Sequence, residues 1–465
     1  MSLQPTQVVV VGAGIAGLVA ARELARDRRI RVTVLEGSPR TGGKLLRGSV
    51  AGIETDLGAE AVLARRPEGL ALMAQLQLDA VHPQTTSAAI WSRGRLRPLP
   101  GGHVMGVPAD VRRLAASGVV SRLGVARAAL DLVLPATAVG DDTSVAAFVG
   151  TRMGREVVDR LVDPLLGGVY AGRADELSLK ATLPQIAAVA GERSLLHALR
   201  ARVAAPAGPV FAGLRGGVGR LAEALTADLA AAGVTVVLGC AARELARTSE
   251  GWRVVCGTAA APTLVDADAV VLALPATPAA RLLAVAAPAA ARELAAIEYS
   301  SMAIVTLAFG SAAFENPLSG SGFLVPAVEG RLVKGVTFST GKWGWYSDVA
   351  PGLVVVRCSI GRHGDIGDLQ KSDDELVAGA VRDLSAATGV RGVPRDAVVT
   401  RWGGALPQYA VGHLDRVRRI KAGLSGLAGL AACGAAFDGV GIPACIASGR
   451  AAATQVLDQL FAGRQ

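Results

Sequence analysis

The chain has 465 residues, of which 51% are hydrophobic, with 48 Lys and Arg against 39 Asp and Glu. This length allows two or three domains around a large core, and so hydrophobic a composition excludes a disordered chain. The formal charge of +9 suits solubility, or a basic surface for an acidic substrate or an anionic membrane. No basic run is interleaved with aromatic residues, so we expect no nucleic-acid partner.

The cysteine pattern predicts neither a disulfide framework nor a metal site. The number is odd and no two cysteines have C-x-x-C spacing; they are Cys240, Cys256, Cys358, Cys433 and Cys445. A reducing cytoplasm is the expected location. We predict no signal peptide, because the N-terminus lacks a basic segment, and no membrane-spanning helix, because no stretch offers about 20 apolar residues free of Gly, Pro and charge.

The first elements form a predicted βαβ unit. Residues 7–11 are an apolar, β-branched run typical of a buried parallel strand, residues 18–28 have a helical pattern, and residues 31–35 form a second strand. Residues 12–17 read G-A-G-I-A-G, which is the spacing of a dinucleotide-binding turn. Glu36 ends the second strand, where a carboxylate can accept hydrogen bonds from ribose hydroxyls. The alternative is a glycine-rich turn without a ligand.

Helical patterns replace strand patterns from about residue 100 to residue 205. Within this stretch, residues 110–134 carry four arginines against two aspartates. The segment is therefore either a solvated face or a surface that favours anionic lipid.

Strands and helices then alternate to the end of the chain. Ser372 and Glu375 have the spacing of a capping box, which predicts a helix that begins there and continues to Leu384. The other helices are predicted at 219–232 and 449–461, and the strands at 234–238, 252–256, 269–273, 303–309, 332–338, 353–360 and 427–433. Because the βα pattern recurs at both ends and in the middle, we predict one α/β nucleotide domain built from discontinuous segments.

Several motifs add a family resemblance. Glu36 is followed by Arg40, Gly42 and Gly43, and this E-x-x-x-R-x-G-G pattern resembles flavin-binding proteins related to amine oxidases. Further segments read D-L-G-A-E at 56–60, D-P-L-L-G-G-V-Y-A-G at 163–172, P-Q-Y-A-V-G-H at 407–413 and F-D-G-V-G-I-P-A-C-I at 437–446. Together they resemble the protoporphyrinogen/coproporphyrinogen oxidase family, over nearly the whole chain.

The resemblance implies a fold and a division of the chain. A Rossmann-type FAD domain would be built from residues 1–90, 206–290 and 401–465. A helical, membrane-facing and substrate segment would occupy 91–205, and the β-sheet of an α+β substrate domain would occupy 291–400. A third class of function, a non-catalytic flavin-binding partner of the haem pathway, is disfavoured by the intact flavin motifs.

The implied activity is FAD-dependent oxidation of a porphyrinogen, with O₂ reduced to H₂O₂. We favour coproporphyrinogen III, because its four propionates suit a basic chain and because the Ala/Arg/Gly-rich composition resembles that of actinobacteria with the coproporphyrin-dependent haem route. The alternatives are protoporphyrinogen IX and, within the wider superfamily, an amine oxidase or desaturase. The implied partners are the porphyrinogen, O₂, a ferrochelatase that receives the porphyrin, and the inner face of the cell membrane as a peripheral contact.

The resemblance also implies a set of flavin contacts. By position they are Gly12, Ala13, Gly14, Ile15, Ala16, Gly17, Glu36, Arg40, Gly43, Gly58, Ala59, Glu60, Ala61, Ala242, Trp402, Val440, Gly441 and Ile442. Ala242 stands where the family usually has Val, so only backbone contacts carry over there. We assign no catalytic side chain, because the flavin itself is the hydride acceptor.

Substrate residues are expected among glycines and cations. Gly168 lies in the glycine-punctuated segment, and Arg66 follows the flavin turn at the expected substrate entrance. Weaker candidates for the propionates are Arg93, Arg95, Arg97, Lys334 and Lys342.

Overall fold

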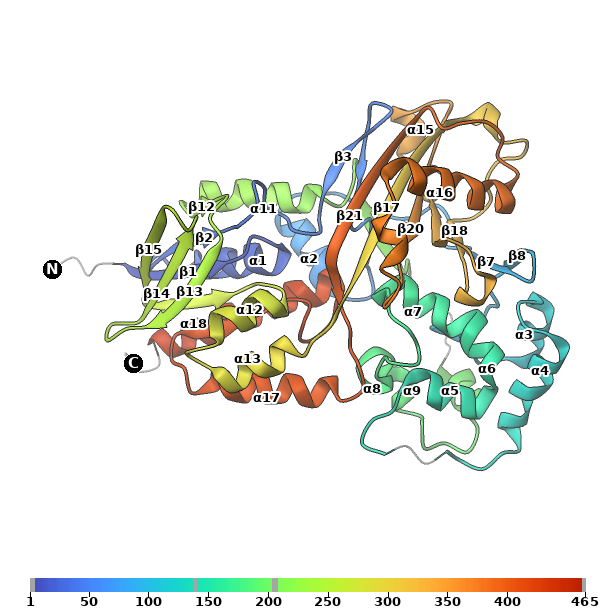
Figure 1. The fold of residues 1–465 in the computed structure, drawn as a ribbon, viewed down its shortest axis with the longest axis horizontal. Helices are drawn as coiled ribbons and strands as arrows, with labels where there is room; N and C mark the ends of the chain where they lie inside the picture. Colours follow the sequence, from blue (N-terminus) through green and yellow to red (C-terminus); the bar gives the residue numbers. More distant parts are fainter. Residues whose placement is uncertain (1–4, 138–139, 203–207, 462–465) are drawn as a thin grey trace.

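The computed structural model describes residues 5–137, 140–202 and 208–461, and Figure 1 shows their fold. Two large sheets organise the chain, one parallel and one mostly antiparallel, and a group of helices lies beside the second. Within the described ranges, no helix has the length and the hydropathy needed to cross a membrane.

The parallel sheet has five strands from three distant segments of the chain. Its order is β12-β2-β1-β16-β22, with β12 at Thr235–Val237, β2 at Ile30–Leu35, β1 at Thr6–Val11, β16 at Ala269–Leu272 and β22 at Leu430–Ala432. Every neighbouring pair is parallel. The predicted Rossmann-type α/β fold built from discontinuous segments is therefore confirmed.

Alternate residues of the central strand β1 enter two different cores. Val8 and Val10 pack with α1 (Ile15–Leu24), α11 (Arg220–Ala231) and α18 (Ile442–Phe461). Val9 and Val11 pack on the other face, with the small sheet of β13 (Ala242–Arg247), β14 (Trp252–Gly257) and β15 (Pro262–Ala267) and with three helices. Those helices are α12 (Ala276–Leu283), α13 (Pro288–Ala295) and α17 (His413–Ser425).

The second large sheet has seven strands in the order β21-β17-β20-β19-β18-β7-β8. These are β21 (Asp396–Pro407), β17 (Tyr299–Gly310), β20 (Leu353–Ile360), β19 (Val333–Phe338), β18 (Gly322–Leu324), β7 (Ala89–Ser92) and β8 (Arg95–Pro98). The apolar side of α16 (Asp373–Thr388) packs on one face of this sheet. Ser372 and Glu375 form the predicted capping box at the start of α16.

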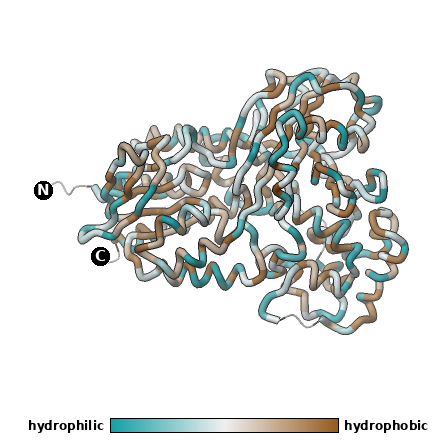
Figure 2. Tube along the Cα trace, viewed as in Figure 1, coloured by the Kyte–Doolittle hydropathy of each residue, from teal (hydrophilic) through white to brown (hydrophobic). Residues whose placement is uncertain are grey.

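A helical segment continues from β8 and lies against the end of this sheet (Figure 1). It contains α3 (Val111–Ser117), α4 (Arg122–Ala129), α5 (Val145–Met153), α7 (Asp163–Tyr170) and α10 (Leu195–Arg202). Arg152 and Asp131 form a fully buried ion pair of 2.6 Å inside it. Figure 2 shows that hydrophobic and hydrophilic stretches alternate along this outer segment.

Some predicted boundaries are wrong. The first helix begins at Ile15 and ends at Leu24, rather than spanning 18–28, and the last begins at Ile442 rather than at 449. In both cases the glycines lie inside the helix, because Gly17 and Gly449 permit close approach to neighbouring backbone. The strand predicted at 427–433 covers only Leu430–Ala432, since Gly429 has a positive φ of 73°. The segment predicted to lack strands contains the short pair β9 (His103–Val104) and β10 (Val107–Pro108).

Candidate functional site

The loop between β1 and α1 contains three glycines with different constraints. A Cβ on Gly12 would lie 2.5 Å from the carbonyl oxygen of Ala273, and one on Gly17 would lie 1.9 Å from the carbonyl oxygen of Gly12. A Cβ on Gly14 would meet no protein atom within 4 Å. Packing therefore requires two of these glycines, whereas Gly14 keeps space open at the N-terminus of α1, where the helix dipole favours a phosphate group.

Glu36 lies at the end of β2, directly beside this loop. Its carboxylate accepts hydrogen bonds from the backbone N–H groups of Ala13 (2.7 Å) and Ser38 (2.8 Å). A carboxylate has about four acceptor positions, so two remain for the hydroxyls of a ribose. Among the described residues, no cation forms an ion pair with Glu36. Its geometry fits the predicted ribose contact.

The loop after Glu36 folds over the glycine turn. Gly42 donates its N–H to the carbonyl oxygen of Ala13 at 2.8 Å, and a Cβ on Gly43 would lie 3.2 Å from Cα of Gly14. Arg40 donates to the carbonyl oxygen of Gly43 at 2.7 Å, and burial lowers the pKa of its guanidinium. No carboxylate within the described ranges forms an ion pair with Arg40, so its charge is available to a diphosphate.

The turn after β4 (Ile53–Asp56) is also tightly fixed. The carboxylate of Asp56 accepts the N–H groups of Val218 (2.7 Å) and Gly219 (2.9 Å), and burial raises its pKa to about 7. A Cβ on Gly58 would lie 2.1 Å from the carbonyl oxygen of Lys44 and 3.1 Å from the ring of Trp402. The turn thus lies against Lys44, at the end of the loop after Glu36, on one side and against Trp402 on the other.

Glu60 forms a buried polar network with the large sheet. Its carboxylate accepts hydrogen bonds from Ser339 (2.9 Å) and from the indole of Trp343 (3.0 Å). Lys342 and Arg357 lie 3.5 and 3.2 Å from its other oxygen. Burial alone would raise the pKa of this carboxyl, but the two cations and the two hydrogen bonds lower it to about 2.

Glu60 is thus ionised and fully engaged by protein, so a flavin contact in this turn falls to the backbone. The neighbouring Ala59 donates its N–H to the carbonyl oxygen of Lys44 at 3.0 Å, and Ala61 packs at the edge of the core around Trp343.

The segment before α18 is held by an aromatic stack. The hydroxyl of Tyr409 accepts the N–H of Gly439 at 2.8 Å and donates to the carbonyl oxygen of Ala435 at 2.7 Å. Its ring stacks on His413 with centroids 3.9 Å apart. Burial lowers the pKa of His413 to about 4, so this imidazole is neutral and structural.

This stack orients the turn that contains Val440 and Gly441. The turn leads into α18, whose first residue is Ile442, so the N-terminal end of a long helix lies at this position. Such an end carries a partial positive charge. Cys445 follows in the first turn, and burial raises the pKa of its thiol to about 11, as expected of a buried structural residue.

The remaining predicted residues lie at the two ends of the site. Ala242 begins β13, next to Ala241, whose Cβ would contact a Cβ on Gly37 at 3.2 Å, beside Glu36. Arg66 precedes α2 (Pro67–Gln75), and one of its guanidinium nitrogens lies 3.9 Å from the position of a Cβ on Gly439.

The last predicted substrate residue lies in α7. Gly168 is exposed there and faces the side chain of Leu324 in β18, 3.7 Å from the position of a Cβ on the glycine. Four segments therefore meet at the site: the glycine turn, the loop at 40–43, the turn at 58–61 and the start of α18. Gly168 lies apart from them, in the contact between α7 and the large sheet.

Lys44 is a further candidate site residue that was not predicted from the sequence. Burial lowers the pKa of its amine, and the thiol of Cys445 in the first turn of α18 lies near enough to act on it. A cation between the glycine loop and α18 suits an electron-rich flavin. Its position directly after Gly42 and Gly43 was the available signal.

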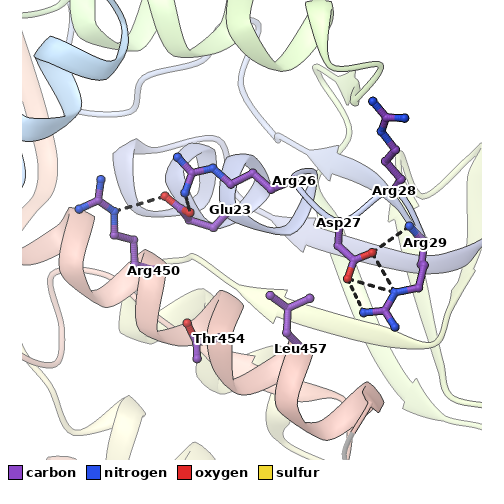
Figure 3. Close-up of a pocket in the computed structure, with 8 residues that line it drawn as sticks. All are labelled: Glu23, Arg26, Asp27, Arg28, Arg29, Arg450, Thr454 and Leu457. Carbon is purple, nitrogen blue, oxygen red and sulfur yellow. Dashed lines mark hydrogen bonds and ion pairs between the residues drawn. The ribbon is translucent and has the colours of Figure 1, made fainter. Parts of the chain in front are cut away.

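The pocket drawn in Figure 3 is separate from this site. It lies between the end of α1 and the middle of α18 and is lined by Glu23, Arg26, Asp27, Arg28, Arg29, Arg450, Thr454 and Leu457. None of the predicted site residues lines it.

Comparison with known proteins agrees with this geometry. The family model described as flavin containing amine oxidoreductase matches residues 15–457. The chain is 40% identical to a coproporphyrinogen III oxidase of Mycobacterium leprae, covering 95% of this chain and 96% of the relative, and 31% identical to one of Bacillus subtilis, covering 99% and 100%. A solved structure from Exiguobacterium sp., described provisionally as a protoporphyrinogen oxidase, has a TM-score of 0.86 at 29% identity and covers 98% of this chain and 99% of its own.

Proposed function

The chain belongs to the family of flavin containing amine oxidoreductases, and on this premise we propose that it oxidises coproporphyrinogen III to coproporphyrin III with O₂ as the acceptor. The observation that carries the proposal is the similarity to curated coproporphyrinogen III oxidases over at least 95% of the chain. The cofactor is FAD, and the glycine loop, Glu36 and Arg40 offer the space, the acceptor and the cation that such a dinucleotide needs.

The reaction removes six electrons and six hydrogens from the porphyrinogen, so it consumes three O₂ and releases three H₂O₂ for each porphyrin. FAD supplies the two-electron acceptor that takes hydride from carbon and passes electrons to O₂. The protein has to hold the substrate at the right distance and exclude competing reactions. A flavin ring bound near the start of α18 would have Lys44 and the N-terminal end of that helix as sources of positive charge to stabilise its reduced form.

Two titratable side chains of the described site, His413 and Glu60, are already engaged by protein groups, and Asp56 holds the backbone of residues 218 and 219. His413 is buried and neutral, stacked on Tyr409, and Glu60 is ionised and engaged with Lys342 and Arg357. This supports a reaction centred on the flavin, in which the protein binds and orients the porphyrinogen without a general acid or base.

Oxygen uptake by the purified holoprotein tests the activity. We expect coproporphyrinogen III to consume three O₂ per porphyrin, with H₂O₂ accumulating in the same ratio. Protoporphyrinogen IX is the second candidate substrate, favoured by the similarity to the Exiguobacterium structure. Faster turnover of protoporphyrinogen IX would transfer the assignment to that substrate, and no oxygen uptake with either would overturn it.

We further propose that the helical segment rests on a membrane surface and that the porphyrin is passed to a ferrochelatase. Leu123 is 83% exposed and Val133 is 67% exposed, so both side chains are available to contact a membrane surface. Arg112 and Arg122 are exposed nearby in the chain. Arg127, in contrast, points inward and donates to backbone carbonyls of α5. The basic surface predicted from four arginines therefore lacks Arg127.

A further inference from the structure

Lys334 is a buried lysine whose amine has no partner among the described residues. The residue is 5% exposed, and its Nζ is a buried donor without a hydrogen bond. An unpaired ammonium in a protein interior is costly, so buried charges are nearly always paired or bind a ligand. Lys334 therefore needs an explanation that the fold does not supply.

An irregularity in β19 places this side chain. In the pairing with β20, Val333 lies opposite Ile360 and Gly335 lies opposite Ser359, so Lys334 is an extra residue in a β-bulge. Bulges redirect side chains and occur often beside active sites. Val333 and Val336 pack into the apolar core beneath α16, a core to which Lys334 does not contribute.

The surroundings of Lys334 are basic. The charged group that acts on its amine is Arg362. The guanidinium of Arg362 donates to the carbonyl oxygen of Val325 at 3.0 Å. Val325 in turn donates its N–H to the carbonyl oxygen of Lys334 at 2.9 Å. Arg362 is influenced by Asp163 and Asp365, which offset its charge. Burial, and after it the charge of Arg362, lowers the pKa of the Lys334 amine to about 7, and no carboxylate of the described residues forms an ion pair with it.

The strand that carries Lys334 packs against α7, the helix that carries the predicted substrate residue Gly168. Leu324 pairs with Gly335 across β18 and β19, and the side chain of Leu324 faces both Gly335 and Gly168. The helix α7 packs over these two strands, and Gly168 and Val169 leave part of its surface exposed. Lys334 thus directly precedes Gly335, the strand position that faces α7.

We propose that Lys334, supported by Arg362, binds a carboxylate of the substrate and so forms a propionate subsite next to α7. This inference rests on the proposed function, because the four carboxylates of coproporphyrinogen III supply the anion. The bound carboxylate would supply the partner that the amine lacks. The subsite is a binding and specificity element and takes no part in hydride transfer.

Titration of the holoprotein with coproporphyrin III tests the subsite without turnover. Lys334→Met removes the charge with little change in volume, and Lys371→Met is the matched control, because Lys371 is a partly exposed lysine paired with Asp368. We expect Lys334→Met to weaken coproporphyrin III binding roughly 10- to 100-fold, as loss of a charged hydrogen bond does, and Lys371→Met to leave it unchanged. Coproporphyrin III tetramethyl ester, which has no charge, should bind the wild type and Lys334→Met equally.

Thermal melting of the same proteins adds a second readout. Removing an unpaired buried charge should leave the Tm of the porphyrin-free protein equal or higher, while the rise in Tm on adding coproporphyrin III should shrink. Unchanged affinity in Lys334→Met, an equal loss for the ester, or a lower Tm without porphyrin would each overturn the subsite. Failure of the wild type to oxidise coproporphyrinogen III would overturn the proposed function alone, since the binding measurements do not depend on turnover.

Discussion

Arg357 in β20 connects the large sheet to the turn after β4 through Glu60, with 3.2 Å between guanidinium and carboxylate. The same guanidinium donates to the carbonyl oxygen of Gly58. Both side chains are largely buried, and Lys342 lies 3.5 Å from the same carboxylate oxygen. One ionised glutamate therefore fixes the turn beside the glycine loop to the sheet that carries Lys334.

The first prediction concerns this carboxylate and pH. The pKa of Glu60 is about 2 in the folded protein against an ordinary value of 4.5. Its stabilising contribution is therefore complete above about pH 4.5 and is lost as the pH falls toward 2. We expect Glu60→Gln to lower the free energy of unfolding at pH 7 by about 3 kcal/mol, because it leaves two buried cations without their partner.

Urea unfolding of wild type and Glu60→Gln from pH 7 to pH 3 measures this effect. The difference between the two proteins should narrow as the pH falls below 4.5. Asp56, whose pKa is raised to about 7, acts in the opposite direction, since its raised pKa removes stability as the pH rises from 3.8 to 7. It is present in both proteins, but the charge of Glu60 contributes to raising its pKa, so its effect cancels only in part in the difference. Glu250→Gln, at an exposed position, is the control, and a difference that does not depend on pH would contradict the prediction.

The second prediction separates two glycines of the loop. Ala at position 14 meets no protein atom, so Gly14→Ala should leave the stability of the FAD-free protein unchanged but weaken FAD binding at least about tenfold, which corresponds to 1.4 kcal/mol. Gly17→Ala would place Cβ 1.9 Å from a carbonyl oxygen and should destabilise the FAD-free protein by about 1–3 kcal/mol.

Fluorescence titration of FAD and thermal melting of the FAD-free proteins distinguish the two variants. If Gly14→Ala bound FAD as tightly as the wild type, the open space beside α1 would not be the phosphate site. If both variants lost stability equally, the loop would be a packing feature alone.

The third prediction concerns the ribose acceptor. Glu36→Ala should weaken FAD binding by roughly 1.5–3 kcal/mol, the usual size of a charged hydrogen bond. Glu36 also accepts two backbone N–H groups, so Glu36→Gln, which keeps one carbonyl oxygen, should show a smaller loss. Equilibrium titration of the FAD-free proteins provides the numbers, and unchanged affinity in Glu36→Ala would remove this residue from the site.

The parallel sheet was predictable because its signals are local. Strand β1 is a continuous apolar run, and the glycine spacing and Glu36 follow it within one βαβ unit. The capping box at Ser372 and Glu375 is also a local pattern and is confirmed. In contrast, the hairpin of β3 (Arg47–Val50) and β4, and the long strand β21, were not predicted, because their residues are mostly half-buried and do not alternate cleanly.

The polar network could not be predicted, because its members are far apart in the chain. Glu60, Lys342 and Arg357 meet only when the large sheet packs against the turn. Lys342, considered as a propionate ligand from sequence, is used instead by Glu60. Lys334 was a weaker propionate candidate from the sequence, but its unpaired amine could not be predicted, since burial and a missing partner are properties of the folded chain. The predicted domain boundary between residues 291–400 and residues 401–465 stays a prediction.

The fourth prediction concerns the helical segment. Arg122→Gln combined with Leu123→Ser should reduce flotation with anionic liposomes, because it removes an exposed cation and an exposed apolar side chain. The charge contributes about 1 kcal/mol near an anionic surface, so the loss of flotation should be smaller at high salt, where only the missing Leu123 side chain still matters. Val285→Ser is the control, since Val285 is 89% exposed but lies between α12 and α13. Equal flotation of all three proteins would reduce the segment to a solvated face.

The fifth prediction ranks two cations by burial. Arg66 is 44% exposed on its side chain and already lies 3.1 Å from Glu68, so solvent and a competing carboxylate weaken any contact with a propionate. Such exposed pairs contribute up to about 1 kcal/mol, and Arg66→Ala should raise KM for coproporphyrinogen III no more than about fivefold. The contact would be equal in ground state and transition state, so kcat should not change. Steady-state oxygen uptake gives both constants, with Arg65→Ala as the neighbouring control. A KM effect of Arg66→Ala larger than that of Lys334→Met would reverse the ranking and place the main carboxylate contact at the entrance rather than beside α7.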